Sequence, residues 1–143
     1  MAAHDKMDYI TVASLGNCSD FGNLTSAKNL GSEGPSSGVR GTAPGGSSTD
    51  IDYWTFASLG NASDFGDLTV SKGYGPAGMS NGTRGVMGGG NVGAGTYTDL
   101  IDYITIAATG NATDFGNLTS GRSSSGGCSS DLGRGIMQGG SDD

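Results

Sequence analysis

A 21-residue sequence occurs three times in this chain of 143 residues, with copies that begin DYITVASLGN, DYWTFASLGN and DYITIAATGN. In each copy a Tyr is followed 31 residues later by an Arg, and a Gly-Gly pair lies five and six residues beyond that Arg. Such internal similarity at a fixed spacing is the signature of a repeat protein. The three repeats occupy residues 8–46, 52–90 and 102–140.

The segments between the repeats vary, whereas the repeats themselves keep a fixed length. The repeats are offset by 44 and then 50 residues, and all of the difference lies between a Gly-Gly pair and the next Tyr. A unit that is fixed everywhere except at one place indicates a structural repeat with one tolerant surface loop. We therefore expect a single repeat domain over residues 1–143, with variable loops at 47–51 and 91–101.

The residues of each repeat predict β-structure. The segments 8–14, 52–58 and 102–108 are rich in β-branched and aromatic residues, and Gly-Asn turn signals follow them. A second strand is expected in DFGNLT and its counterparts, and a hairpin around Asn81-Gly82, a pair typical of type I′ turns. No segment shows the period of an amphipathic helix. We expect an all-β fold with four short antiparallel strands in each repeat.

Three repeats are too few for an ordinary propeller, which has about four to eight blades. We therefore expect the last two strands to pair with the first two. Pairing within one chain would give a β-prism-like body of three sheets, and pairing between two chains would give a propeller-like ring of blades. We favour closure within the chain, because it covers the exposed strand edges without a partner.

The strand order and the repeated residues resemble known repeats. A Tyr strand, a Phe strand, a strand of small residues and an Arg–Gly-Gly strand resemble the kelch repeat of β-propellers, although Phe21, Phe65 and Phe115 replace the kelch Trp. The longer patterns DYITIAATGNATDFGNLT and TRGVMGGG are similar to repeats in virion structural proteins of tailed bacteriophages that infect cyanobacteria. That resemblance covers nearly the whole chain. It implies assembly in the bacterial cytoplasm, a place on the virion surface, and the major capsid protein or other virion proteins as partners.

Composition excludes several other kinds of partner. The net charge of −7 and the isoelectric point near 4.3 disfavour nucleic acid, since phosphate binding needs a basic surface. No apolar run is long enough to span a membrane, and MAAHDKMDYI lacks the apolar segment of a secretory signal. We therefore expect binding to neither nucleic acid nor membrane.

Residues with catalytic chemistry are scarce. His4 is the only histidine and lies outside the repeats, and no Ser-His-Asp or Cys-His set is supported. We expect no enzymatic activity, no catalytic residues, no cofactor and no metal. The repeated acids could hold calcium or sugars, or they could cap tight turns, and we favour caps. These acids are Asp8, Asp52, Asp102, Asp20, Asp64 and Asp114.

Most basic residues also belong to the repeat. They could line a channel or bind an acidic glycan, but we favour structural ion pairs and hydrogen bonds to loop carbonyls. They are Lys28, Lys72, Arg122, Arg40, Arg84 and Arg134. Six glycosylation sequons arise from the copied turn sequence, and we interpret them as turns. Their asparagines are Asn17, Asn23, Asn61, Asn81, Asn111 and Asn117.

Five residues depart from the repeat pattern. Trp54, Tyr74 and Tyr97 could stack on sugar rings, although a core position is the favoured role of Trp54. Cys18 replaces Ala and Cys128 replaces Gly. Both could be tolerated small residues, or they could approach each other and form a disulfide that staples the closure.

These observations favour a non-enzymatic virion structural protein, a small decoration or knob protein on the capsid surface. One alternative is a receptor-binding module of a tail fibre or spike, whose variable loops bind host surface glycans. A further alternative is a lectin-like carbohydrate-binding protein.

Overall fold

The computed structural model describes residues 3–29, 33–123, 125–130 and 133–142. Within these residues the chain forms strands and no helix, which confirms the predicted all-β class. The strands are β1 (His4–Tyr9), β2 (Ser19–Lys28), β3 (Arg40–Pro44), β4 (Ser48–Thr55), β5 (Ser63–Lys72), β6 (Ala77–Ser80), β7 (Arg84–Gly88), β8 (Asn91–Gly93), β9 (Thr96–Tyr97), β10 (Leu100–Thr105), β11 (Thr113–Asn117), β12 (Gly126–Ser129) and β13 (Gly135–Gln138).

The two largest sheets each join strands of two successive repeats. One sheet has the order β3-β4-β5, and a bridge between Ser36 and Gly41 extends it at the β3 edge. The other has the order β6-β7-β10-β11. In both, the last strands of one repeat pair antiparallel with the first two strands of the next repeat. A complete sheet therefore belongs to a junction between repeats and not to a single repeat.

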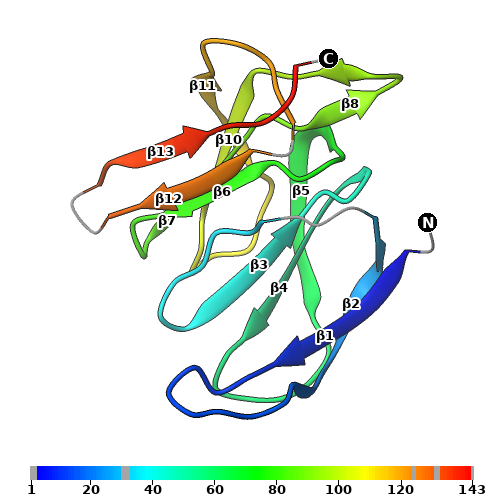
Figure 1. The fold of residues 1–143 in the computed structure, drawn as a ribbon, viewed down its shortest axis with the longest axis vertical. Coiled ribbons are helices and arrows are strands. Elements are labelled where there is room, and N and C mark those ends of the chain that lie inside the picture. The colour runs from blue at the N-terminus through cyan, green and yellow to red at the C-terminus, as the bar shows by residue number, and fades with distance from the viewer. Residues whose placement is uncertain (1–2, 30–32, 124, 131–132, 143) are drawn as a thin grey trace.

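The two terminal hairpins form sheets of only two strands each, β1-β2 and β12-β13. Figure 1 shows β1 and β2 in the lower part of the molecule, and β12 and β13 in the upper part. The hairpin β1-β2 packs next to β5, and β12 packs next to β6. Among the described residues no sheet closes into a barrel or propeller, so the predicted closure stays a prediction.

The Tyr strands are displaced from the predicted segments 8–14, 52–58 and 102–108. They end at Tyr9, Thr55 and Thr105, because the chain turns immediately afterwards. In the third repeat this turn contains a hydrogen bond of 3.0 Å from Ala108 N to Thr105 O. The strands also begin earlier than expected, so most of the predicted variable loop 47–51 belongs to β4.

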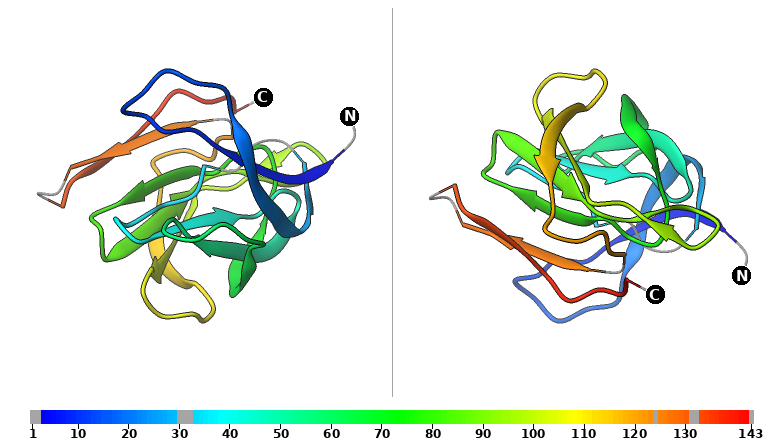
Figure 2. Two further views of the ribbon diagram at one scale, coloured as in Figure 1. Left: turned by 90° about the horizontal axis from the view of Figure 1, so that it is seen from below. Right: turned by 90° about the horizontal axis from the view of Figure 1, so that it is seen from above.

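Two further predictions about turns need correction. The variable segment 91–101 contains the hairpin β8-β9 and the start of β10, and Figure 2 draws it in yellow-green. The predicted hairpin β6-β7 is present, but its turn is not type I′. Of Asn81 and Gly82, only Gly82 has a positive φ, 85°. The Asn81 carboxamide oxygen instead accepts hydrogen bonds from the amides of Thr83 and Arg84, which stabilises the three-residue connection between β6 and β7.

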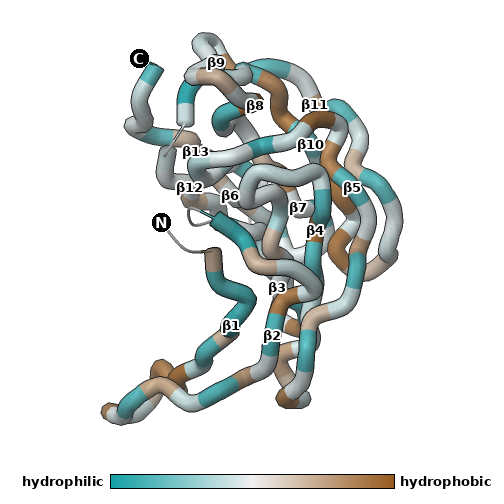
Figure 3. Tube along the Cα trace, turned by 90° about the vertical axis from the view of Figure 1, so that its right-hand side faces the viewer, coloured by the Kyte–Doolittle hydropathy of each residue, from teal (hydrophilic) through white to brown (hydrophobic). Residues whose placement is uncertain are grey.

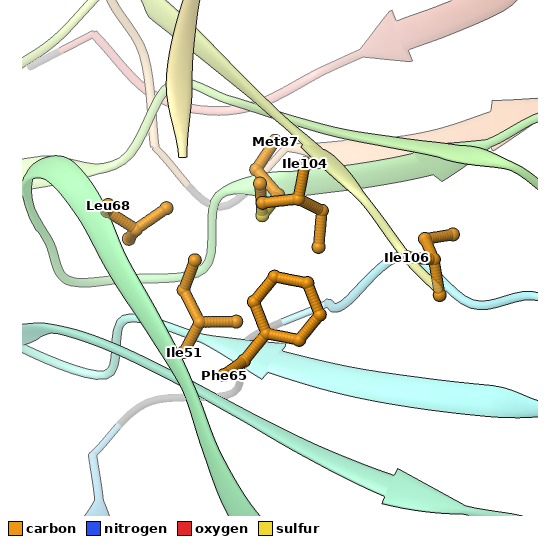
Figure 4. Packing of buried hydrophobic residues seen from close by; sticks show 6 residues of the cluster. All are labelled: Ile51, Phe65, Leu68, Met87, Ile104 and Ile106. Carbon is orange, nitrogen blue, oxygen red and sulfur yellow. The ribbon is translucent and has the colours of Figure 1, made fainter. Parts of the chain in front are cut away.

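The main apolar cluster lies between the two largest sheets (Figure 4). Residues of β4 and β5 supply one half of it, and residues of β7 and of the segment 104–106 supply the other half. Its buried members are Ile51, Phe65, Leu68, Met87, Ile104 and Ile106. The core is therefore another feature of a junction between repeats.

Candidate functional site

Lys72 and Asp102 form a buried ion pair between the second and third repeats. Both side chains are fully buried, and Lys72 Nζ lies 3.1 Å from Asp102 Oδ2. The ammonium also donates to the carbonyl oxygens of Leu100 at 2.9 Å and Met87 at 3.2 Å. Thr69 Oγ1 donates to Asp102 Oδ1 at 2.5 Å. These contacts give the buried charges partners, without which burial would be very costly.

The electrostatics of this pair have two opposing causes. Burial lowers the pKa of Lys72 below its ordinary value of 10.5, whereas the charge of Asp102 acts to raise it. Asp102 Oδ2 has no well-aligned hydrogen bond within the described residues, although the ammonium 3.1 Å away compensates its charge. A buried, carbonyl-bound lysine of this kind ties strands together and is closed to solvent.

The first junction repeats the arrangement with Lys28 and Asp52. Lys28 Nζ lies 3.6 Å from Asp52 Oδ2 and donates to the carbonyl oxygens of Gly45 and Asp50. Thr25 Oγ1 donates to Asp52 Oδ1. The predicted structural role of these lysines is confirmed. The prediction that Asp52 and Asp102 cap turns is wrong, because each carboxylate binds the lysine of the preceding repeat.

The repeated arginines of the first two repeats are structural as well. The guanidinium carbon of Arg40 lies 4.7 Å from the ring centroid of Tyr53, and that of Arg84 lies 4.7 Å from Tyr103. Arg40 Nη1 also donates to the carbonyl oxygens of Ile106 and Ala107. Each arginine thus binds the Tyr strand of the next repeat by a cation–π contact.

The second set of repeated acids behaves as predicted in two copies. Asp64 Oδ1 and Asp114 Oδ1 accept hydrogen bonds from the amides of Gly66 and Gly116. Each carboxylate therefore caps a local turn of the backbone two residues ahead. In the described part of the chain the Asp20 carboxylate forms no hydrogen bond or ion pair.

The asparagines of the copied turn connect repeats, which the sequence did not indicate. Asn61 Oδ1 accepts from the amide of Asn23, and Asn111 Oδ1 accepts from the amide of Asp67. Asn23 lies on β2 and Asn117 on β11, so the prediction that all sequons lie in turns is wrong for these two. The sequence around Asn61 and Asn111 could not reveal that each accepts a hydrogen bond from an amide 38 or 44 residues away.

Two core residues of the second junction have exposed counterparts near the ends of the described chain. Phe65 is 3% exposed in the core, whereas Phe115 is 51% exposed. Ile106 is 1% exposed at the second junction, whereas its counterparts are 50% exposed at the first junction (Phe56) and 92% exposed in the β1-β2 hairpin (Val12). Figure 3 shows hydrophobic segments at the tip of the β1-β2 hairpin, away from the body of the molecule. The β1-β2 hairpin and the β11 side of the third repeat therefore expose apolar surface that an adjoining repeat buries at the second junction, and we call each of these surfaces a half-junction.

A cavity of about 600 Å³ opens at the C-terminal half-junction. Five of its lining residues occupy the same repeat positions as residues in or beside the main apolar cluster, but lie one repeat later in the chain. They are Ile101, Phe115, Leu118, Arg134 and Met137. Their counterparts are Ile51, Phe65, Leu68, Arg84 and Met87. The cavity thus has the lining of the main apolar cluster on one side, but no residues equivalent to Ile104 and Ile106 fill it.

The residues that depart from the repeat pattern are scattered. Trp54 is partly buried, and its ring packs against Gly41 and edge-on to Phe56, but it lies outside the main apolar cluster, so its favoured core role is not confirmed. Tyr74 is half-exposed, and Tyr97 lies on β9. Cys18 and Cys128 are both free and exposed, so the hypothesised disulfide is not formed. They lie on separate terminal hairpins, which do not pair with each other.

The described residues contain neither a metal-binding cluster nor a membrane-spanning helix. His4 is exposed on β1, and no three His, Cys, Asp or Glu side chains are placed to hold a metal ion there. In the same residues no helix is long and apolar enough to cross a membrane. No protein family and no curated protein matches the chain.

Proposed function

We propose that the protein is a non-enzymatic structural protein of a bacteriophage virion and decorates the surface of the capsid. The observation that carries this proposal is the use of the repeated charges. Lys28, Lys72 and their carboxylate partners are buried between repeats and hold the strands together. These repeated charged residues therefore have a structural role. The exposed half-junctions suit a protein that associates with other protein subunits. The resemblance to repeats of phage virion proteins supports the same conclusion.

The proposed assembled form is closed. A propeller-like or β-prism-like arrangement requires the terminal strands β1 and β13 to pair, within one chain or between chains. The major capsid protein or another virion protein is the proposed anchor on the particle. A net charge of −7 suits a surface that faces water.

Immunogold labelling of purified phage particles whose genome encodes this chain tests the function. Antibodies against the 143-residue chain should label the capsid and leave the tail unlabelled. Antibodies against the major capsid protein and a tail protein serve as position controls. Absence of the chain from purified particles would contradict the virion assignment, and label confined to the tail would support the second candidate.

The second candidate is a tail fibre or spike module that binds host glycans, or a lectin-like protein with the same chemistry. The observation that favours it is a half-exposed Tyr74 beside the variable hairpin, since Gly73 pairs with Asn91 of β8. Exposed aromatic rings can stack on sugars. Binding on a glycan array that is lost in Tyr74→Ala would support this candidate.

A further inference from the structure

The two junctions inside the chain show how one repeat binds the next. At the first junction β3 pairs with β4, and Thr42 lies opposite Tyr53. At the second junction β7 pairs with β10, and Val86 lies opposite Tyr103. The register is the same at both junctions, because equivalent positions of the repeat lie opposite each other. The repeat thus contains a defined template for a third junction.

Both halves of a third junction are present in this chain, but they do not meet within it. The half that ends in β13 lacks the Tyr strand that β4 and β10 provide elsewhere, and β1 lacks a strand equivalent to β3 or β7. We propose that copies of this chain associate head to tail, with β13 of one copy paired antiparallel to β1 of a second copy. The template places Ile136 opposite Tyr9.

The apolar surfaces of the two halves complement each other. The cavity of about 600 Å³ is lined by counterparts of Ile51, Phe65 and Leu68. In the central core those residues pack against Ile104 and Ile106. The counterparts of these two isoleucines are Ile10 and Val12, which are exposed. Inserted into the cavity of a second copy, they would bury apolar surface that both halves now expose to water.

The charged groups are complementary in the same register. Asp8 is exposed and stands at the position of Asp52 and Asp102. The third-repeat counterpart of Lys28 and Lys72 is Arg122, which keeps the positive charge. In the proposed interface Arg122 of one copy pairs with Asp8 of the next. Arg134 likewise lies over the ring of Tyr9, as Arg84 lies over that of Tyr103.

The third repeat also has a surface near Gly116 that could contact the turn of the β1-β2 hairpin of a second copy. At the second junction Gly110 N donates to Phe65 O at 2.7 Å, and a Cβ added to Gly66 would lie 2.5 Å from Gly110 O. Gly116 has nearly the same φ, 137° against 138° at Gly66. An added Cβ at Gly116 would meet no atom within 4 Å. That open position fits Gly16 of a second copy.

A second copy is the proposed occupant because the chain holds its own two halves apart. Each terminal hairpin packs on its neighbouring sheet, β2 next to β5 and β12 next to β6. In Figure 1 the two hairpins lie at different levels along the long axis. Head-to-tail contacts of this kind are heterologous, so they generate rings when the rotation closes and filaments when it does not. The proposal concerns this chain alone and does not depend on the virion assignment.

Disulfide trapping between two singly substituted chains tests the proposed register. The background is Cys18→Ala with Cys128→Gly, which restores the residues of the other repeats. One chain then carries Tyr9→Cys and the other carries Ile136→Cys. Directly opposite residues of antiparallel strands have Cα atoms about 4.5–5.5 Å apart, which is within the range of a disulfide. The matched control replaces Tyr9→Cys by His4→Cys, also on β1 but about 17 Å further along the strand.

Oxidation of the first mixture should give a covalent dimer in a yield about tenfold above the control mixture, because only the first pair meets disulfide geometry. Val12→Asp should abolish this dimer, whereas Leu15→Asp on the same turn should leave it unchanged. Circular dichroism of each variant should match the parent spectrum. Equal yields from both mixtures would overturn the proposal. So would an intrachain bond in the Tyr9→Cys, Ile136→Cys double variant when mixing of single variants gives no dimer, since β13 would then pair with β1 of its own chain.

Discussion

The central junctions and the terminal hairpins contain nearly the same residues in opposite environments. The second junction buries Phe65, Ile106 and the Lys72–Asp102 pair. The corresponding Phe115 on β11 and Val12 in the turn of the β1-β2 hairpin are exposed. For Phe65 and Phe115 the difference arises from the neighbouring repeat, because the residue type is the same. A repeat of this protein is therefore not an independent folding unit, and its stability resides in the interfaces between repeats.

The largest expected effect concerns the buried lysine. Lys72→Met should lower the free energy of unfolding by about 3–5 kcal/mol, because the carboxylate of Asp102 stays buried without its partner. Arg122→Met, at the equivalent position of the third repeat, should change it by less than about 0.5 kcal/mol in dilute protein. Urea unfolding measures both. Similar losses in the two variants would show that the terminal half-junction is already formed within one chain.

Shortening an apolar side chain at equivalent positions compares the buried core with the exposed β1-β2 hairpin. Ile106→Ala should destabilise the protein by about 2–4 kcal/mol, because it leaves a cavity beside Phe65. Val12→Ala should have almost no effect on dilute protein, since Val12 is exposed. Thermal unfolding followed by circular dichroism at low concentration compares the two. A marked loss of stability in Val12→Ala would contradict the exposed state of this hairpin.

Two glycines with nearly the same φ give a smaller and closely matched test. Gly66→Ala and Gly116→Ala share the strain of a positive φ, but only Gly66→Ala places a methyl group against the backbone of Gly110. Gly66→Ala should therefore be the more destabilising by about 1–3 kcal/mol. Chemical unfolding of both variants at low concentration measures the difference. Equal losses would mean that backbone strain alone governs both positions.

The pH dependence of Lys72 is expected to be the smallest effect, because it is confined to an alkaline window. Burial lowers the native-state pKa below 10.5, so between the two values the unfolded state binds more protons. The contribution of this group to the free energy of unfolding therefore rises with pH across the window. In Lys72→Arg the guanidinium stays protonated, so this rise should be absent. A stability difference between wild type and Lys72→Arg that falls with increasing pH would contradict the lowered pKa.

The sequence predicted features that depend on local residues. The β-rich composition and the turn signals gave the all-β class, and the capping roles of Asp64 and Asp114 follow from a backbone amide two residues away. The hairpin β6-β7 was likewise predicted from its turn residues, although Asn81 uses its side chain instead of a positive φ.

Features that depend on contacts between repeats were not predictable in the same way. Asp52 resembles a turn residue in the sequence, but its partner Lys28 lies on a strand of the preceding repeat. The segment 91–101 looks like a loop because it varies, yet it contains β8-β9. The three repeats indicate that the terminal strands need a partner, but the cavity beside β11 depends on how side chains pack and has no signal in the sequence.

Amide hydrogen exchange at increasing protein concentration tests most directly whether the terminal hairpins are halves of one junction. The amides of β4 and β7, within complete sheets, should be protected at every concentration. In dilute protein the amides of β1 and β13 should exchange rapidly, and their protection should rise with concentration toward that of β4 and β7. Rapid exchange of β1 and β13 at all concentrations, or full protection in dilute monomer, would contradict the account.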